Sequence, residues 1–106
     1  MIILAMALAL DGTFWSGNDL LEVCRSNRDG SSICAAYIMG VVDTEANTAG
    51  YQGRLPIFCI PTGATNVQLV DVTVRYLEDR PELRHASAAG LVQAAMVKAF
   101  ACAASG

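Results

Sequence analysis

The clearest helical signal in this chain is the stretch Thr65-Asn66-Val67-Gln68-Leu69-Val70-Asp71-Val72-Thr73-Val74-Arg75-Tyr76-Leu77. It opens with Thr and Gln three residues apart, the pattern of a capping box, in which two side chains satisfy free backbone N–H groups. Valine is frequent here, so a strand is possible, but the apolar spacing fits a period of 3.6 better than a period of 2. The helix is expected to bury one face, made of Leu69, Val70, Thr73, Val74 and Leu77.

Three further helices are expected around this one. Ser16 and Asp19 form a second capping box, which predicts a short helix directly after it. A longer helix is expected over residues 32–46, and a last one from Pro81 to Ala101, where Ala, Leu, Val and Met dominate. The sequence therefore predicts an all-α fold, a small four-helix bundle-like domain.

Composition narrows the class of protein. The chain has 106 residues, of which 54% are hydrophobic and 16% charged, and its net charge is -3. This length suits a single domain, and the high apolar share excludes a disordered chain. The seven basic residues are scattered among acids, whereas a nucleic-acid-binding surface needs clustered positive charge. No apolar run is long enough for a membrane span. We therefore expect neither nucleic acid nor a membrane span.

The N-terminus has the character of an export signal. Residues 1–10 are almost purely apolar, and Ala7-Leu8-Ala9 has the small-x-small form of a cleavage site. We expect residues 1–10 to be a signal peptide or its remnant, and residues 11–106 to form the single helical domain. No basic residue precedes Arg25, so an apolar first helix packed on the core stays open as the alternative.

The cysteines indicate covalent staples. Cys24, Cys34, Cys59 and Cys102 are an even number in a short chain, which in an exported protein predicts two disulfides. Their spacing lacks the close pairs that chelate zinc. Free thiols in a cytosolic core remain the other alternative. Spacing alone does not choose among the three possible pairings.

No catalytic constellation is visible in the sequence. His85 is the only histidine, and cysteines in disulfides cannot act as its nucleophilic partner. Asp43 and Glu45 are two residues apart in an expected helix and so point to different faces. We expect a protein that is not an enzyme and that uses no cofactor or metal.

Several short motifs follow one another along the chain. They are Gly17-Asn18-Asp19-Leu20-Leu21, then Cys34-Ala35-Ala36-Tyr37-Ile38-Met39-Gly40-Val41-Val42-Asp43, then Phe58-Cys59-Ile60-Pro61, then Gln68-Leu69-Val70 and Tyr76-Leu77, and finally Arg80-Pro81-Glu82 and Ala99-Phe100-Ala101-Cys102. The order of these motifs resembles the Rap/Tai-type immunity-protein family associated with bacterial type VI secretion. The chain departs from the family's frequent Phe-Pro-Cys ending, since it has Phe100-Ala101-Cys102. Tyr37 and Gly40 also have simple structural explanations, as a core ring and a close helix contact.

The resemblance implies a small, periplasmic, helical, disulfide-bonded protein that binds a secreted effector, a peptidoglycan-cleaving amidase, and neutralises it. The sketched helices place all four sulfurs at one end of the bundle. Together with the resemblance, this favours the pairs Cys24 with Cys102 and Cys34 with Cys59.

The expected partner-binding residues lie on and near one loop. Residues 47–55 are rich in Gly and polar residues and predict a protruding loop, which carries Tyr51, Gln52 and Arg54. Tyr and Arg are enriched at interface hot spots. Asp43, at the exposed end of the preceding helix, is the fourth expected contact. A homodimer is a further protein partner considered, and a periplasmic chaperone or envelope stress-response binding protein is the alternative function.

Overall fold

The computed structural model of the chain describes residues 13–30 and 32–103. The signal peptide expected over residues 1–10 lies outside these described residues. Within them the elements are α2 (Gly17–Ser26), α3 (Ile33–Gln52), α4 (Asn66–Asp79), the 3-10 turn η1 (Pro81–Leu83) and α5 (Ala88–Ala99). No strand occurs in the described residues, where Ser16 and Ser87 form an isolated antiparallel bridge. The predicted all-α fold is confirmed.

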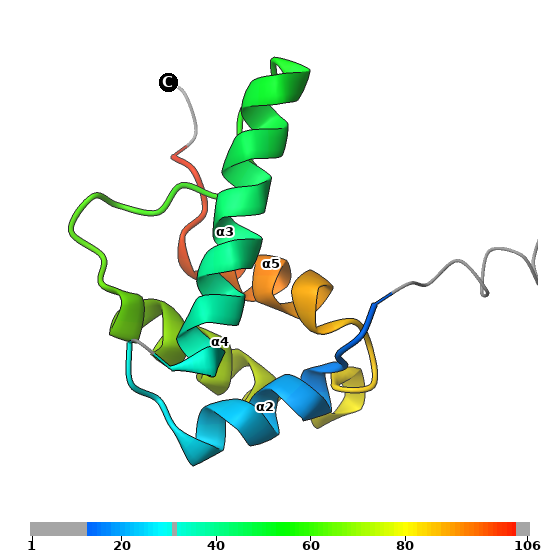
Figure 1. Cartoon of the computed structure of the whole chain (residues 1–106). Coiled ribbons are helices and arrows are strands. Elements are labelled where there is room, and N and C mark those ends of the chain that lie inside the picture. Colours follow the sequence, from blue (N-terminus) through cyan, green and yellow to red (C-terminus); the bar gives the residue numbers. More distant parts are fainter. Residues whose placement is uncertain (1–12, 31, 104–106) are drawn as a thin grey trace, which may run out of the picture.

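The helices enclose one hydrophobic core at the lower end of α3. Figure 1 shows α2, α4 and α5 gathered around the N-terminal half of α3, while the C-terminal half of α3 rises away from them. Each of these four helices contacts the other three, and the contacts of α4 are the most extensive. No helix in the described part of the chain is long and apolar enough to cross a membrane. The largest fully buried side chains are Leu20, Leu21, Ile38, Leu77, Met96, Val70, Val74 and Val92.

The local signals for α2 and α4 are confirmed. Thr65 Oγ1 accepts a hydrogen bond from Gln68 N at 3.2 Å, and Thr65 N donates to Gln68 Oε1 at 2.7 Å. Ser16 and Asp19 form the same reciprocal arrangement at the start of α2. The expected face of α4 is buried in full: Leu69, Val70, Thr73, Val74 and Leu77.

Helix α3 is longer than predicted. The expected end near residue 46 is wrong, because the helix continues through Gln52 and residues 47–52 of the expected loop are helical. The helix stops at Gly53, whose φ of 66° is left-handed. Gly53 N donates to Gly50 O at 3.2 Å and Arg54 N donates to Ala49 O at 2.9 Å, which are the two bonds of a Schellman motif.

Helix α5 begins later than predicted. The expectation of a helix from Pro81 is wrong, because only the 3-10 turn forms there and α5 starts at Ala88, capped by Ser87. The chain between the two elements pairs with the entry to α2: Gly17 N donates to Ala86 O, and Ala88 N donates to Trp15 O, both at 2.9 Å. These tertiary hydrogen bonds use backbone groups of Ala86 and Ala88 that a continuous helix from Pro81 would need for its own hydrogen bonds.

Both disulfides exist, but the favoured pairing is wrong. The bonds join Cys24 to Cys34 and Cys59 to Cys102, with Cα–Cα distances of 4.9 and 4.8 Å. Cys24 lies near the end of α2 and Cys34 near the start of α3, so the short turn between them holds the two within disulfide reach. Cys59 N donates to Phe100 O at 2.8 Å, which brings Cys59 beside Cys102.

Two motif residues on α3 differ in their surroundings. Tyr37 is a half-buried core ring, stacked on Trp15 with centroids 5.0 Å apart, and burial raises the pKa of its hydroxyl. The expectation of a close helix contact at Gly40 is wrong. Gly40 is exposed, and a Cβ built there has no neighbour within 4 Å.

Candidate partner-binding site

The C-terminal end of α3 projects from the body of the protein. Figure 1 shows no other helix beside the upper turns of α3. Burial follows the same division: Cys34, Ala35 and Ile38 are buried in its first half, whereas only Glu45 and Ala49 are buried in its second. Residues 47–57, which comprise the end of α3 and the segment after it, are called the α3 tip below. The tip is the protruding feature that the sequence predicted, built as a helix end rather than a loop.

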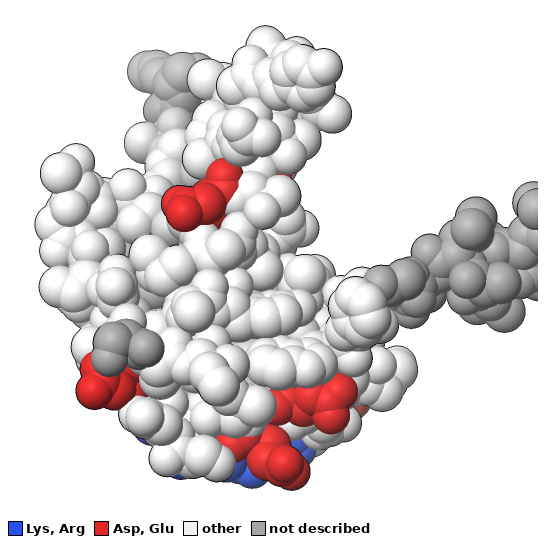
Figure 2. All heavy atoms as spheres, viewed as in Figure 1, with Lys and Arg blue, Asp and Glu red and all other residues white. Residues whose placement is uncertain are grey.

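The α3 tip exposes large apolar side chains. Tyr51 is 90% exposed and Leu55 is 86% exposed, and Ile57 is 46% exposed. In Figure 2 the surface at the top of the molecule, formed by this end of α3, is almost free of Lys, Arg, Asp and Glu. Interface cores are depleted in charge and enriched in aromatic side chains, so this surface has the composition of a contact site.

A buried carboxylate holds the tip in place. Glu45 is only 4% exposed, and its two oxygens accept from Arg54 Nη1 at 2.8 Å and Nη2 at 3.1 Å. The same carboxylate accepts from Ile57 N at 2.9 Å. Arg54 Nη1 also donates to Leu55 O at 3.1 Å. One acid on α3 therefore fixes the chain that turns back from the end of the helix.

These bonds set the charge state of the pair. The Arg54 guanidinium, and then the Ile57 amide, hold the pKa of the Glu45 carboxyl down at about 2. The carboxylate in turn raises the pKa of Arg54. A bidentate pair of this kind is directional, because the planar guanidinium matches the carboxylate. Glu45 is thus ionised whenever the protein is folded near neutral pH.

The four sequence-predicted contact residues divide into two groups. Tyr51, Gln52 and Arg54 lie together at the tip, where Gln52 Oε1 accepts from Arg54 Nε at 2.8 Å. Asp43 is exposed on α3, but at about 1.5 Å per residue it stands roughly 12 Å below Tyr51 along the helix axis. Arg54 is engaged with Glu45, so much of its role is to shape the tip.

Sequence reasoning missed three residues of this site. In the sequence Glu45 stands out only as a candidate catalytic acid, whereas in the structure it anchors the tip. Leu55 and Ile57 are large apolar residues in a segment that shows no helical period. This feature is the sequence signal by which they could be recognised as part of the site. The partners of Glu45 lie 9 and 12 residues further on, so no local spacing rule pointed to them.

Two other features considered in the sequence are the histidine and possible metal ligands. His85 is exposed in the turn before α5. Within residues 13–30 and 32–103, no cluster of three His, Cys, Asp or Glu side chains could hold a metal ion.

Comparison with known protein families identifies the family of this chain. The family model described as Rap1a immunity proteins matches residues 16–102. The chain belongs to the Rap1a immunity protein family. No curated protein and no solved structure shows a match to it. Membership agrees with the resemblance carried by the sequence motifs, and it indicates an immunity protein directed against a toxin.

The motif residues of this Rap1a-family protein build its framework. Gly17 starts α2 close to Leu91 of α5, Cys34 and Cys59 each belong to one of the two disulfides, and Arg80 is the C-cap residue of α4. None of the quoted motifs covers residues 44–57. The α3 tip therefore lies between two of these motifs, within the residues 16–102 that the family model matches, on a scaffold that the motif residues hold together.

Proposed function

We propose that this Rap1a-family chain is a periplasmic immunity protein that binds and inhibits a peptidoglycan-cleaving amidase toxin delivered by a type VI secretion system. The α3 tip enters the cleft of the amidase and blocks access of peptidoglycan. The observation that carries the proposal is the projection of α3 with Tyr51 and Leu55 almost fully exposed at its end. A narrow, rigid and apolar projection suits a concave partner.

Rigidity supports inhibition rather than general client binding. The bonds from Arg54 and Ile57 to Glu45 hold the tip in one arrangement before any partner arrives. Preorganised contacts lose less conformational entropy on binding and so give higher affinity. A chaperone for many clients would instead gain from an adaptable apolar surface.

The two disulfides support the periplasmic location. Both bonds join cysteines of the described chain, and no free cysteine occurs among them. Disulfides persist in oxidising compartments such as the bacterial periplasm and are rare in the cytosol. The amidase that attacks peptidoglycan would meet its inhibitor in that same compartment.

The test is calorimetric titration of the purified, oxidised protein with the secreted amidase encoded beside its gene, together with a peptidoglycan hydrolysis assay. We expect binding in the nanomolar range and loss of hydrolysis at equal concentrations. Tyr51→Ala plus Leu55→Ala should weaken binding by about 2 kcal/mol or more, the size of a hot spot.

Ile33→Ala is the matched control, because Ile33 is a 69% exposed apolar residue at the opposite end of α3. It should bind the amidase with unchanged affinity. Binding of unfolded client proteins without binding of the amidase would instead support the chaperone function. Amidase binding that is unaffected by the tip variant would move the interface away from the tip.

A further inference from the structure

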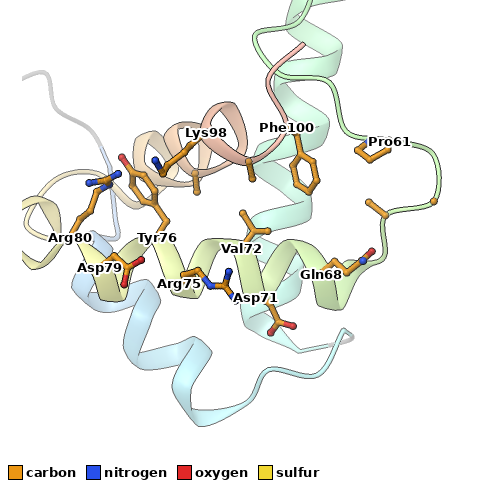
Figure 3. A pocket seen from close by; sticks show the side chains of 14 residues that line it. Pro61, Gln68, Asp71, Val72, Arg75, Tyr76, Asp79, Arg80, Lys98 and Phe100 are labelled. Atoms are coloured by element: carbon orange, nitrogen blue, oxygen red, sulfur yellow. The ribbon is translucent and has the colours of Figure 1, made fainter. Parts of the chain in front are cut away.

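A groove of about 620 Å³ lies between α4 and the C-terminal end of α5, away from the α3 tip. The chain between Cys59 and Thr65 closes one end of it, where Figure 3 shows Pro61 and Phe100 facing each other. This volume falls within the usual range for a ligand pocket. The groove is not used by the proposed inhibition of an amidase.

At one end of the groove, two cationic side chains lie around the phenol ring of Tyr76. The Arg80 Cζ lies 4.8 Å from the centroid of the Tyr76 ring, and Figure 3 shows the Lys98 ammonium on the hydroxyl side of the same ring. Neither Arg80 nor Lys98 forms an ion pair within the described residues. The Asp79 carboxylate points away from the Tyr76 hydroxyl (Figure 3). This end can therefore receive an anion.

The other charged side chains of the groove leave the positive charge of Arg80 and Lys98 uncancelled. Asp71 accepts a hydrogen bond from Arg28 Nη2 at 3.0 Å, so Arg28 compensates part of its charge. Arg75 adds a further positive charge on the α4 side of the groove. The protein as a whole carries a net charge of -3, so the positive end of the groove is a local feature.

The rest of the groove is apolar with a few hydrogen-bonding groups. Val72 and Phe100 are half-buried and Ala95 is buried, so they form an apolar floor. At the far end, the Gln68 side-chain oxygen serves the capping box, which leaves its NH₂ group to donate. From Gln68 to Asp79 the helix rises about 16 Å at 1.5 Å per residue. About five residues of extended peptide span that length.

We propose that this groove binds the carboxyl-terminal segment of a partner polypeptide. The terminal carboxylate meets the Arg80 guanidinium, the Lys98 ammonium and the Tyr76 hydroxyl, and apolar side chains of the segment pack on Val72 and Phe100. Charge-assisted hydrogen bonds to a carboxylate are about twice as strong as neutral ones, and Arg offers a planar pair of donors. The free NH₂ group of Gln68 can donate to a carbonyl of a peptide backbone, whereas an acyl chain offers it no acceptor.

Fluorescence polarisation of three labelled probes tests this proposal on the oxidised, full-length chain. The probes are Ser-Ala-Leu-Ala-Leu with a free carboxylate, the same peptide as its C-terminal amide, both labelled with one fluorophore at the N-terminus, and decanoate labelled with that fluorophore at its terminal carbon. We expect the free-acid peptide to bind with micromolar affinity, the amide to bind at least about tenfold more weakly, and decanoate to bind more weakly than the free acid.

Lys98→Gln should reproduce the loss seen with the amide peptide, while Arg75→Gln removes a cation from the same groove away from Tyr76 and should change affinity by less than about threefold. Tyr51→Ala should leave peptide binding unchanged, so the proposal for this groove can be tested independently of the proposal for the α3 tip. Equal binding of acid and amide, stronger binding of decanoate, an unaffected Lys98→Gln variant, or no binding of any probe at about 1 mM would each overturn the proposal.

Discussion

Glu45 and Arg54, nine residues apart in the chain, form a bidentate ion pair that joins the buried side of α3 to the chain beyond its end. Glu45 is 5% exposed at its side chain and Arg54 is 36% exposed, so the pair lies at the boundary of the core. The expected partner-binding residue Arg54 is thus also a structural residue. This dual role changes how mutations at the tip should be interpreted.

Arg54→Ala should lower the melting temperature, because it leaves the buried Glu45 carboxylate without its strongest partner. Tyr51→Ala should change the free energy of unfolding by no more than about 0.5 kcal/mol, since the side chain is 90% exposed. Circular dichroism melting of the two single variants measures both effects. If the Tyr51→Ala plus Arg54→Ala double variant melts at the same temperature as the wild type, the ion pair between Glu45 and Arg54 contributes nothing to stability.

Acid should destabilise the protein through Glu45. The pKa of Glu45 is about 2 in the folded protein, below the value of about 4.3 for an unfolded chain. The unfolded state therefore binds the proton first as the pH falls, so this contribution is complete above about pH 5 and is lost toward pH 2. Urea unfolding across this window should show a steeper loss for the wild type than for Glu45→Gln. Parallel pH profiles for the two proteins would contradict the assignment.

The disulfide pairing should be visible in double-mutant cycles. Loop closure predicts that loss of Cys59–Cys102, with a separation of 43 residues, costs about 4 kcal/mol, and that loss of Cys24–Cys34, with a separation of 10, costs about 3 kcal/mol. Within each pair, the single and double Ala variants should cost nearly the same. Cys24→Ala with Cys102→Ala should instead be additive, because it breaks two bonds. The reverse pattern would restore the pairing favoured by the family resemblance.

Two glycines should respond oppositely to alanine. A Cβ at Gly17 would collide with Leu91 Cδ1 and stand 3.0 Å from Arg84 O, so Gly17→Ala should destabilise by about 1–3 kcal/mol. A Cβ at Gly40 meets nothing within 4 Å, so Gly40→Ala should stabilise by about 0.5–1 kcal/mol through helix propensity. Chemical denaturation of the two variants measures both signs. Destabilisation by Gly40→Ala would indicate a contact at that face of α3.

Much of the architecture could be predicted from local patterns. The capping boxes at Ser16 and Thr65 and the apolar period of α4 marked their helices correctly, because capping bonds and helical periodicity depend on residues within a few positions of one another. The end of α3 is also encoded locally, in Gly53, but the Gly and polar residues before it predict a loop. Glycines inside a helix weaken it without ending it.

The sequence by itself determined the all-α class, the two-disulfide framework and membership of the Rap1a family. Only the tertiary structure decided which cysteines pair, where α5 begins and what Glu45 does. Each of these depends on groups brought together from distant positions: Cys59 beside Cys102, Ser87 against Ser16, and Ile57 N on the Glu45 carboxylate. Spacing along the chain limits which contacts can form, whereas burial and hydrogen-bond satisfaction in the folded core select the ones that do.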